Sequence, residues 1–173
     1  MDEEARLVER CLSGDASAFE VLYTRYYEKV FALARGIVLD ADDAADAVQE
    51  IFTLAYRNLH RFDRRAKFGT WLYRIAVNQS IQLTRRNRHK RHNVELNEAL
   101  ATPVQEAEDT SDPKVQEAMG HLAPQDRAIL TLFYWDELSL NEIGATLHCN
   151  ENAAKTRLYR ARERFRQAYE GLA

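Results

Sequence analysis

Two helix starts separated by a short break lie near the end of the chain and restrict its fold more than any other feature. Ser139 can cap a helix, and Glu142, three residues later, can reach back to the Ser139 amide to complete a capping box. After a stretch that disfavours helix, residues 148–150, Asn150 can accept an amide hydrogen at the start of a second helix. A short capped helix, a tight turn and a longer helix predict a helix-turn-helix over residues 138–166.

The second of these helices is basic on one side. Leu158 and Phe165 lie seven residues apart and mark the side that packs inward. The other side carries a set of polar and cationic residues against a single acid, Glu163: Lys155, Thr156, Arg157, Tyr159, Arg160, Arg162, Arg164 and Arg166. Most such charge runs are only solvated helix surfaces. Because this run follows a capped turn, we favour a helix that enters the major groove of a duplex.

Helices account for the first half of the chain as well. With 173 residues, six glycines and three prolines, the sequence is long enough for two small domains and too poor in turn formers for a sheet protein. Helix-start signals and apolar spacing predict helices over residues 4–12, 16–36, 42–59 and 70–91. We expect the third helix to bury a stripe made of Ala45, Val48, Phe52, Ala55 and Leu59.

An acidic, turn-forming stretch then interrupts the apolar pattern. Residues 96–113 have few large apolar groups, so we expect a flexible linker there. Pro113 and Pro124 can each open a helix after it. A second small core should come from Leu122, Ile129, Leu130, Leu132, Phe133 and Trp135. The prediction is an all-α protein with two small helical domains, residues 1–95 and 114–173, the second being a bundle of about four helices that contains the helix-turn-helix.

The net charge of −3 conceals a strongly basic segment. Residues 61–92 hold ten bases and one acid. Four aromatic residues are interspersed among them: Phe62, Phe68, Trp71 and Tyr73. Aromatic rings near cations suit single-stranded nucleic acid, whose bases offer faces for stacking. The alternative is ordinary core packing, which we expect for Trp71 and at least one phenylalanine. Asn78 and Gln82, one helical turn apart, place hydrogen-bonding groups beside the arginines.

Enzymatic, metal-binding and membrane functions find little support in the sequence. Cys11 and Cys149 lie far apart, and the five histidines lack ligand spacing, so we expect no metal and no cofactor. The acids at residues 42–46 suit the positive end of a helix better than a catalytic site. No apolar run approaches the roughly twenty residues that span a bilayer, and the acidic start, residues 1–4, is unlike a signal peptide. We therefore expect a cytoplasmic protein that is not an enzyme.

Three segments, in order, resemble the bacterial sigma-70 family: residues 42–52, 70–78 and 138–166. The closest match is its small two-domain branch, the extracytoplasmic-function (ECF) sigma factors of RNA polymerase. The resemblance implies that residues 1–95 bind core polymerase and recognise and melt the minus-ten promoter element, while residues 114–173 read the minus-thirty-five element as duplex. The expected function is promoter recognition and transcription initiation, with promoter DNA and core RNA polymerase as partners.

The resemblance also implies a role for individual residues. The helix after the acidic cap docks on the clamp of the largest polymerase subunit, through Asp46, Gln49 and Glu50. The basic loop and the helix after it capture a flipped base of the non-template strand, through Phe62, Lys67, Phe68, Asn78, Gln82 and Arg85. The recognition helix reads the upstream element through Lys155, Thr156, Tyr159 and Arg160, with Arg157 and Arg162 as phosphate or packing candidates. Family members are commonly held inactive by an anti-sigma factor, which we expect as a further partner.

A dimeric helix-turn-helix regulator with an amino-terminal sensor or dimerisation domain is the alternative. It predicts dimers on a palindromic duplex, whereas a sigma factor predicts a monomer that reads two dissimilar elements. Acidic segments before and between the basic ones also predict that the free protein binds promoter DNA weakly.

Overall fold

The computed structural model describes residues 2–95 and 112–172, and all regular secondary structure in these two ranges is helical. The predicted all-α fold is confirmed. Most of the linker predicted at residues 96–113 lies outside the described residues. The helices, with one short 3-10 turn, are α1 (Glu3–Leu12), α2 (Ala16–Val38), α3 (Ala41–Asn58), η1 (Leu59–Arg61), α4 (Phe68–Glu95), α5 (Pro113–Gly120), α6 (Pro124–Tyr134), α7 (Leu140–Thr146) and α8 (Glu151–Gly171).

Side-chain caps fix the starts of the two helices that the sequence singled out. At α7, Ser139 Oγ accepts a hydrogen bond from the Glu142 amide, and Glu142 Oε2 accepts one from the Ser139 amide, so the predicted capping box is confirmed. At α8, Asn150 Oδ1 accepts a hydrogen bond of 2.7 Å from the Ala153 amide. Each cap satisfies a backbone donor that a helix start leaves free. The caps therefore determine where α8 begins and which of its side chains face outward.

Helices α1–α4 pack around one apolar core. Fully buried side chains come from all three long helices: Leu22, Leu33, Ile37, Ile51 and Leu72. The stripe predicted for α3 is wrong at one position, because Ala45 is exposed whereas Ala44 and Ala47 are buried. Ala44, Ala47 and Ile51 follow the three- and four-residue steps that keep side chains on one face of a helix, and Ala45 falls outside that face.

Helices α5–α8 form a second group with its own buried side chains. Its fully or nearly fully buried side chains include Ile129, Leu132, Ile143 and Leu158. The prediction that Trp135 belongs to this core is wrong, since Trp135 is 57% exposed. Helix α6 ends at Tyr134, so the spacing that directs Leu132 inward does not extend to Trp135. Asp136, the next residue, is buried instead.

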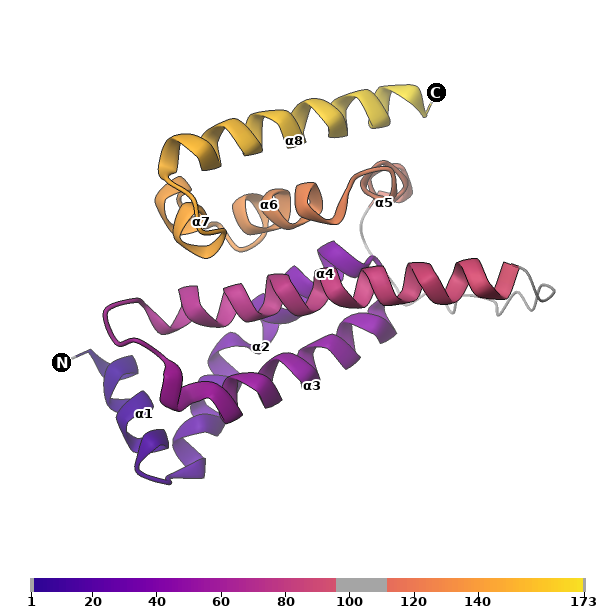
Figure 1. Ribbon diagram of the computed structural model, residues 1–173. Coiled ribbons are helices and arrows are strands. Elements are labelled where there is room, and N and C mark those ends of the chain that lie inside the picture. The colour runs from indigo at the N-terminus through magenta and orange to yellow at the C-terminus, as the bar shows by residue number, and fades with distance from the viewer. Residues whose placement is uncertain (1, 96–111, 173) are drawn as a thin grey trace.

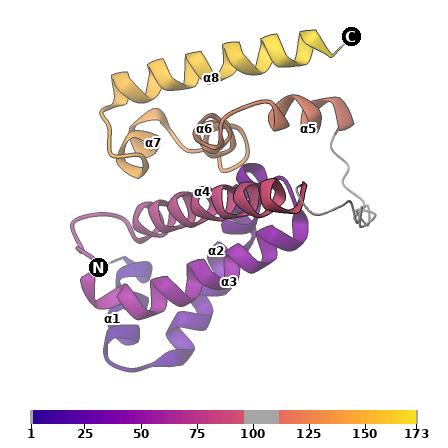
Figure 2. The same cartoon turned by 45° about the vertical axis from the view of Figure 1, so that its right-hand side comes forward.

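The second group of helices lies on the first. Figures 1 and 2 show α5, α6 and α7 between α8 and the first group of helices, with α3 on the far side of α4 and the end of α2 reaching up to α6. Helix α6 packs against α2, and α7 packs against α4. Helix α8 is consequently an outer helix with one side in solvent, whereas α4 is covered along the side that faces α6 and α7.

Candidate nucleic-acid interfaces

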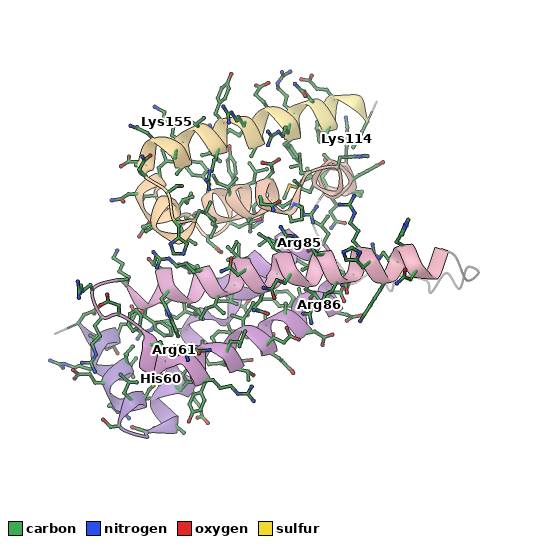
Figure 3. The ribbon with its side chains drawn as sticks, viewed as in Figure 1. His60, Arg61, Arg85, Arg86, Lys114 and Lys155 are labelled. Atoms are coloured by element: carbon green, nitrogen blue, oxygen red, sulfur yellow. The ribbon has the colours of Figure 1, made fainter. Side chains whose placement is uncertain are left out.

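The start of α8 presents the predicted duplex-reading residues to solvent. All six are exposed: Lys155, Thr156, Arg157, Tyr159, Arg160 and Arg162. On the opposite side of the helix, Ala154, Leu158 and Ala161 are buried against the second group of helices. Figure 3 shows Lys155 near the start of α8, on the outer side of the molecule. The small alanines let α8 sit close to its neighbours while its long polar side chains point away.

Two arginines of α8 are tied to α6. Arg162 Nε donates a hydrogen bond of 2.7 Å to Tyr134 Oη, and its guanidinium lies 5.2 Å from the centre of the Phe133 ring. Arg164 Nη1 donates to both carboxylate oxygens of Asp126 at 2.9 Å. Arg162 therefore makes packing contacts with Phe133 and Tyr134, as one of its two predicted roles requires. The partners Tyr134 and Asp126 were not predicted, because no local pattern connects them to α8.

Near the start of α4, three aromatic rings form one cluster. The ring centres of Phe62, Phe68 and Trp71 lie 5.4–5.9 Å apart. Phe68 is 3% exposed and also contacts Tyr26 of α2, whereas Phe62 and Trp71 are half-buried. The core-packing alternative therefore holds for Phe68. Trp71 was not part of the predicted minus-ten set. Of the two phenylalanines in that set, Phe62 keeps part of its surface in solvent.

A cavity of about 730 Å³ lies beside this aromatic cluster. Three of the six predicted minus-ten residues line it: Phe62, Lys67 and Phe68. Asn78, Gln82 and Arg85 lie further along α4, the nearest of them about 15 Å from Phe68 at the rise of an α-helix. Asn78 lines a different cavity, between α4 and the second group of helices. The structure therefore divides the predicted minus-ten set into two parts.

Acidic side chains from other elements lie next to the cations of this loop. Arg64 Nη1 is 2.8 Å from Glu9 Oε1 of α1, and Lys67 Nζ is 3.5 Å from Glu142 Oε1 of α7. Burial raises the pKa of Tyr26, whose hydroxyl donates a hydrogen bond to Glu4 in the same cavity. No local pattern predicts these pairs, because their members lie between 22 and 75 residues apart.

The predicted polymerase-binding residues occupy one exposed face of α3. Asp46, Gln49 and Glu50 line a groove between α3 and α4 with a volume of about 340 Å³. Glu50 Oε2 is 3.3 Å from Arg86 Nη2, and Figure 3 shows Arg86 on the side of α4 toward α3. Lys90 lines the same groove. The two α4 cations in this groove were not predicted as part of it.

Within residues 2–95 and 112–172, no cluster of histidine, cysteine and acidic side chains is arranged to hold a metal ion. No helix in the same ranges has the length and apolar character needed to cross a membrane.

Family models match both groups of helices. The model described as Sigma-70 region 2 matches residues 22–90, and the one described as Sigma-70, region 4 matches residues 113–165. The RNA polymerase sigma-H factor of Pseudomonas aeruginosa is 31% identical, over 99% of this chain and 96% of that protein. The ECF RNA polymerase sigma factor SigW of Bacillus subtilis is 32% identical, over 95% and 96%. The ECF RNA polymerase sigma-E factor of Escherichia coli is 34% identical, over 91% and 89%.

Two solved structures have the same fold. CnrH, in complex with the cytosolic domain of CnrY, superposes with a TM-score of 0.76 and 25% identity over 99% of this chain and 100% of that one. RpoE of Bartonella quintana, in complex with the anti-sigma factor NepR, shares the fold with a TM-score of 0.69 and 19% identity, over 88% and 96%. The two family matches and the relatives that align over nearly the full length show that the chain belongs to the sigma-70 family, as an ECF RNA polymerase sigma factor that acts in transcription initiation.

Proposed function

We propose that this sigma factor reads a promoter in two separate pieces. Residues 1–95 dock on core polymerase and recognise and melt the minus-ten element, residues 114–173 read the minus-thirty-five element as duplex, and residues 96–113 connect them. The observation that carries the proposal is the start of α8, where exposed polar side chains follow a capped turn while Ala154 and Leu158 are buried beneath them.

The first turns of α8 supply the duplex contacts. Lys155 and Arg160 are exposed cations, and Thr156 and Tyr159 offer hydroxyl groups between them. Lysine and arginine reach guanine edges in the major groove, and hydroxyls bond to bases or phosphates. Arg157 adds a phosphate contact. A helix held by its caps and presenting these groups together can read an upstream element without melting it.

The loop before α4 supplies the pocket for an unpaired base. Phe62 offers a partly exposed ring for stacking, Lys67 a cation for the strand backbone, and Phe68 a buried wall. Asn78, Gln82 and Arg85 lie further along α4; we propose that they contact the strand after it leaves the pocket.

The exposed face of α3 docks on core polymerase. Asp46, Gln49 and Glu50 present two carboxylates and an amide, which fit a basic patch on the clamp of the largest subunit. CnrH and RpoE were each solved with a protein partner, the cytosolic domain of CnrY and the anti-sigma factor NepR. We propose that an anti-sigma factor likewise restrains this chain. In this proposal the protein works in the cytoplasm, without a cofactor and without catalysis of its own.

Run-off transcription with purified core polymerase and a promoter library tests the proposal. The full chain should direct transcripts from promoters with two dissimilar elements, and no transcript above the core-alone background would contradict it. A dimer in solution that binds a palindromic duplex without polymerase would instead support the regulator alternative.

Asn78→Ala separates promoter opening from docking. We expect lower permanganate reactivity of the minus-ten thymines, which report strand opening, with unchanged affinity for core polymerase, because Asn78 lies away from the α3 face. An equal loss of polymerase affinity would make Asn78 a structural residue.

A further inference from the structure

A cavity of about 440 Å³ lies between α4 and the helices α6–α8. Part of its lining is apolar and comes from both groups of helices: Val77 and Ile81 of α4, Ala128 and Ile129 of α6, and Leu147 at the end of α7. Small-molecule sites have volumes in this range and combine an apolar lining with a few polar groups at fixed positions. The cavity is therefore large enough, and apolar enough on one side, to take a small organic molecule.

The side of this cavity formed by α8 is basic. Arg157, Arg160 and Arg164 line it, and their spacing of three and four residues places them along one face of the helix. Among the described residues that line the cavity, Asp126 is the one acid, and both of its carboxylate oxygens already accept hydrogen bonds of 2.9 Å from Arg164. The positive charges of Arg157 and Arg160 are therefore left without a negative charge in the cavity.

Arg157 and Arg160 differ in this respect from the arginines further along α8. Every arginine from position 162 to 166 has a hydrogen-bonding or ion-pairing partner. Among residues 2–95 and 112–172, neither the Arg157 nor the Arg160 guanidinium has one. Like charges three residues apart on a helix repel each other, so an anion between them would be attracted to both. They lie about 4.5 Å apart along the helix axis, so each can bind one of two linked phosphates.

We propose that this cavity binds a purine nucleoside diphosphate. Its two phosphates lie at Arg157 and Arg160, whose planar guanidinium groups match phosphate oxygens. The base lies on the apolar side of the cavity, where five side chains offer a two-ring purine more contact than a one-ring pyrimidine. The exposed amides of Asn78 and Gln125 line the same cavity from α4 and α6 and can hydrogen-bond to the edge of the base.

Such a ligand would regulate promoter recognition, a step that rests on the proposed function. Arg157 and Arg160 belong to the residues proposed to contact the upstream element, and a bound diphosphate would occupy both. The ligand and the duplex would then compete for the same cations, so promoter affinity should fall as the nucleotide concentration rises. The cavity would thereby make transcription respond to a small anionic metabolite.

Isothermal titration calorimetry on the full chain, without DNA or polymerase, tests the site itself. In magnesium-free buffer, GDP or ADP should bind one per chain and about tenfold more tightly than UDP or inorganic pyrophosphate, which offer less or no ring surface. Arg157→Gln and Arg160→Gln should each lower nucleotide affinity about tenfold, because each removes a charge from an exposed position. No binding of GDP and ADP, or equal binding of pyrophosphate, would overturn the proposal.

Gln125→Glu and Asn141→Asp are a matched pair that tests the location of the site. Both residues are exposed and occupy the second position of a helix, α6 and α7 respectively, but only Gln125 lines the cavity. A carboxylate is favourable in the first turn of a helix, so both variants should keep the fold. Gln125→Glu should weaken nucleotide binding about fivefold by repelling the phosphates, and Asn141→Asp should bind as wild type does. Equal affinities for the two variants would overturn the assignment to this cavity.

Promoter binding tests the regulatory step. The anisotropy of a fluorescent promoter duplex, titrated with the chain and core polymerase in the absence of nucleoside triphosphates, gives the promoter affinity. GDP at ten times its dissociation constant should weaken this affinity about tenfold for wild type and about threefold for Gln125→Glu. An equal effect of GDP on both proteins, or none on wild type, would overturn the regulatory step. Calorimetry needs no promoter, so failure of the proposed function would be seen separately from failure of the nucleotide site.

Discussion

The two candidate DNA-reading surfaces are built in opposite ways. The start of α8 exposes the side chains that we propose contact the duplex, while Ala154, Leu158 and Ala161 on the opposite side of the helix are buried. The loop before α4 and the first residue of α4 use side chains that belong to the core or to its edge, such as Phe68, 3% exposed. A duplex offers wide grooves, so a projecting helix is enough to read it, whereas an unpaired base needs a walled cavity that only tertiary packing supplies.

Removing a wall of that cavity should produce the largest effect. Phe68→Ala deletes a buried ring that contacts Tyr26, Phe62 and Trp71, so the free energy of unfolding should fall by about 3–5 kcal/mol. Urea unfolding followed by circular dichroism measures it. Phe62→Ala, at a half-buried ring, should lose less stability but more single-strand affinity. If the two variants lost equal stability, the division between wall and stacking surface would be wrong.

The interface between the two groups of helices should respond to pH through Asp136. Burial raises the pKa of Asp136 to about 7, although the nearby Lys29 ammonium lowers it. The unfolded carboxyl titrates near 4, so between about pH 4 and 7 the unfolded chain releases this proton while the folded protein keeps it. The stability that the protonated group contributes is complete below about pH 4 and is lost as pH rises through 7, amounting to at most about 4 kcal/mol.

Asp136→Asn tests this pH dependence. The variant keeps a neutral group in place, so it should be more stable than wild type at pH 8, and the difference should shrink towards pH 4.5. The urea concentration at the midpoint of unfolding, measured from pH 4.5 to pH 8, gives the pH dependence of stability for both proteins. Glu137→Gln, at the exposed neighbour, should keep the wild-type slope. Parallel slopes for wild type and Asp136→Asn would show that Asp136 is ionised in the folded protein at neutral pH.

The same contrast explains which features could be predicted from sequence. Caps and apolar spacing are local, so the two helices of the helix-turn-helix, the capping box between Ser139 and Glu142 and the outward side of α8 could be predicted from residues close to one another in the chain. Long-range packing left no such signal. Neither the pairing of Lys67 with Glu142, 75 residues away, nor the separate cavity of Asn78 could be predicted, because both depend on how α6–α8 lie on α4.

Two predictions from local sequence patterns were wrong by one residue, one at the buried face of α3 and one at the end of α6. Ala45 is exposed although Ala44 beside it is buried, and Trp135 lies just beyond the end of α6. Neither error moved a side chain of the candidate interfaces, since those are set by the caps of α7 and α8 and by the aromatic cluster.

The exposed side chains at the start of α8, which we propose contact the upstream element, should tolerate substitution without loss of fold. Lys155→Ala or Arg160→Ala should weaken transcription from promoters with an intact upstream element by about 1–3 kcal/mol per lost base contact, with little change in unfolding free energy. Run-off transcription on promoters with and without that element measures the effect. Arg166→Ala is the control on the same helix, because Arg166 pairs with Glu163 and Glu170 further from the start. Unchanged promoter strength in both reader variants would remove α8 as the recognition helix.

The smallest expected effect concerns Glu142, whose carboxylate contacts both the start of α7 and Lys67 in the loop before α4. Its Oε2 caps α7 through the Ser139 amide, and its Oε1 lies 3.5 Å from Lys67 Nζ. Glu142→Gln keeps a capping acceptor but removes the charge, so stability should change by less than about 1 kcal/mol, as expected for an exposed ion pair.

Single-strand binding should distinguish the two roles of Glu142. With Lys67 no longer neutralised, the Gln variant should bind the minus-ten oligonucleotide about twofold more tightly at low salt, and the gain should vanish at high salt. Glu142→Ala should show the same gain but lose about 1 kcal/mol of unfolding free energy with the cap. If Gln and Ala lost equal stability, the charge of Glu142 rather than its hydrogen bond to the Ser139 amide would stabilise the start of α7.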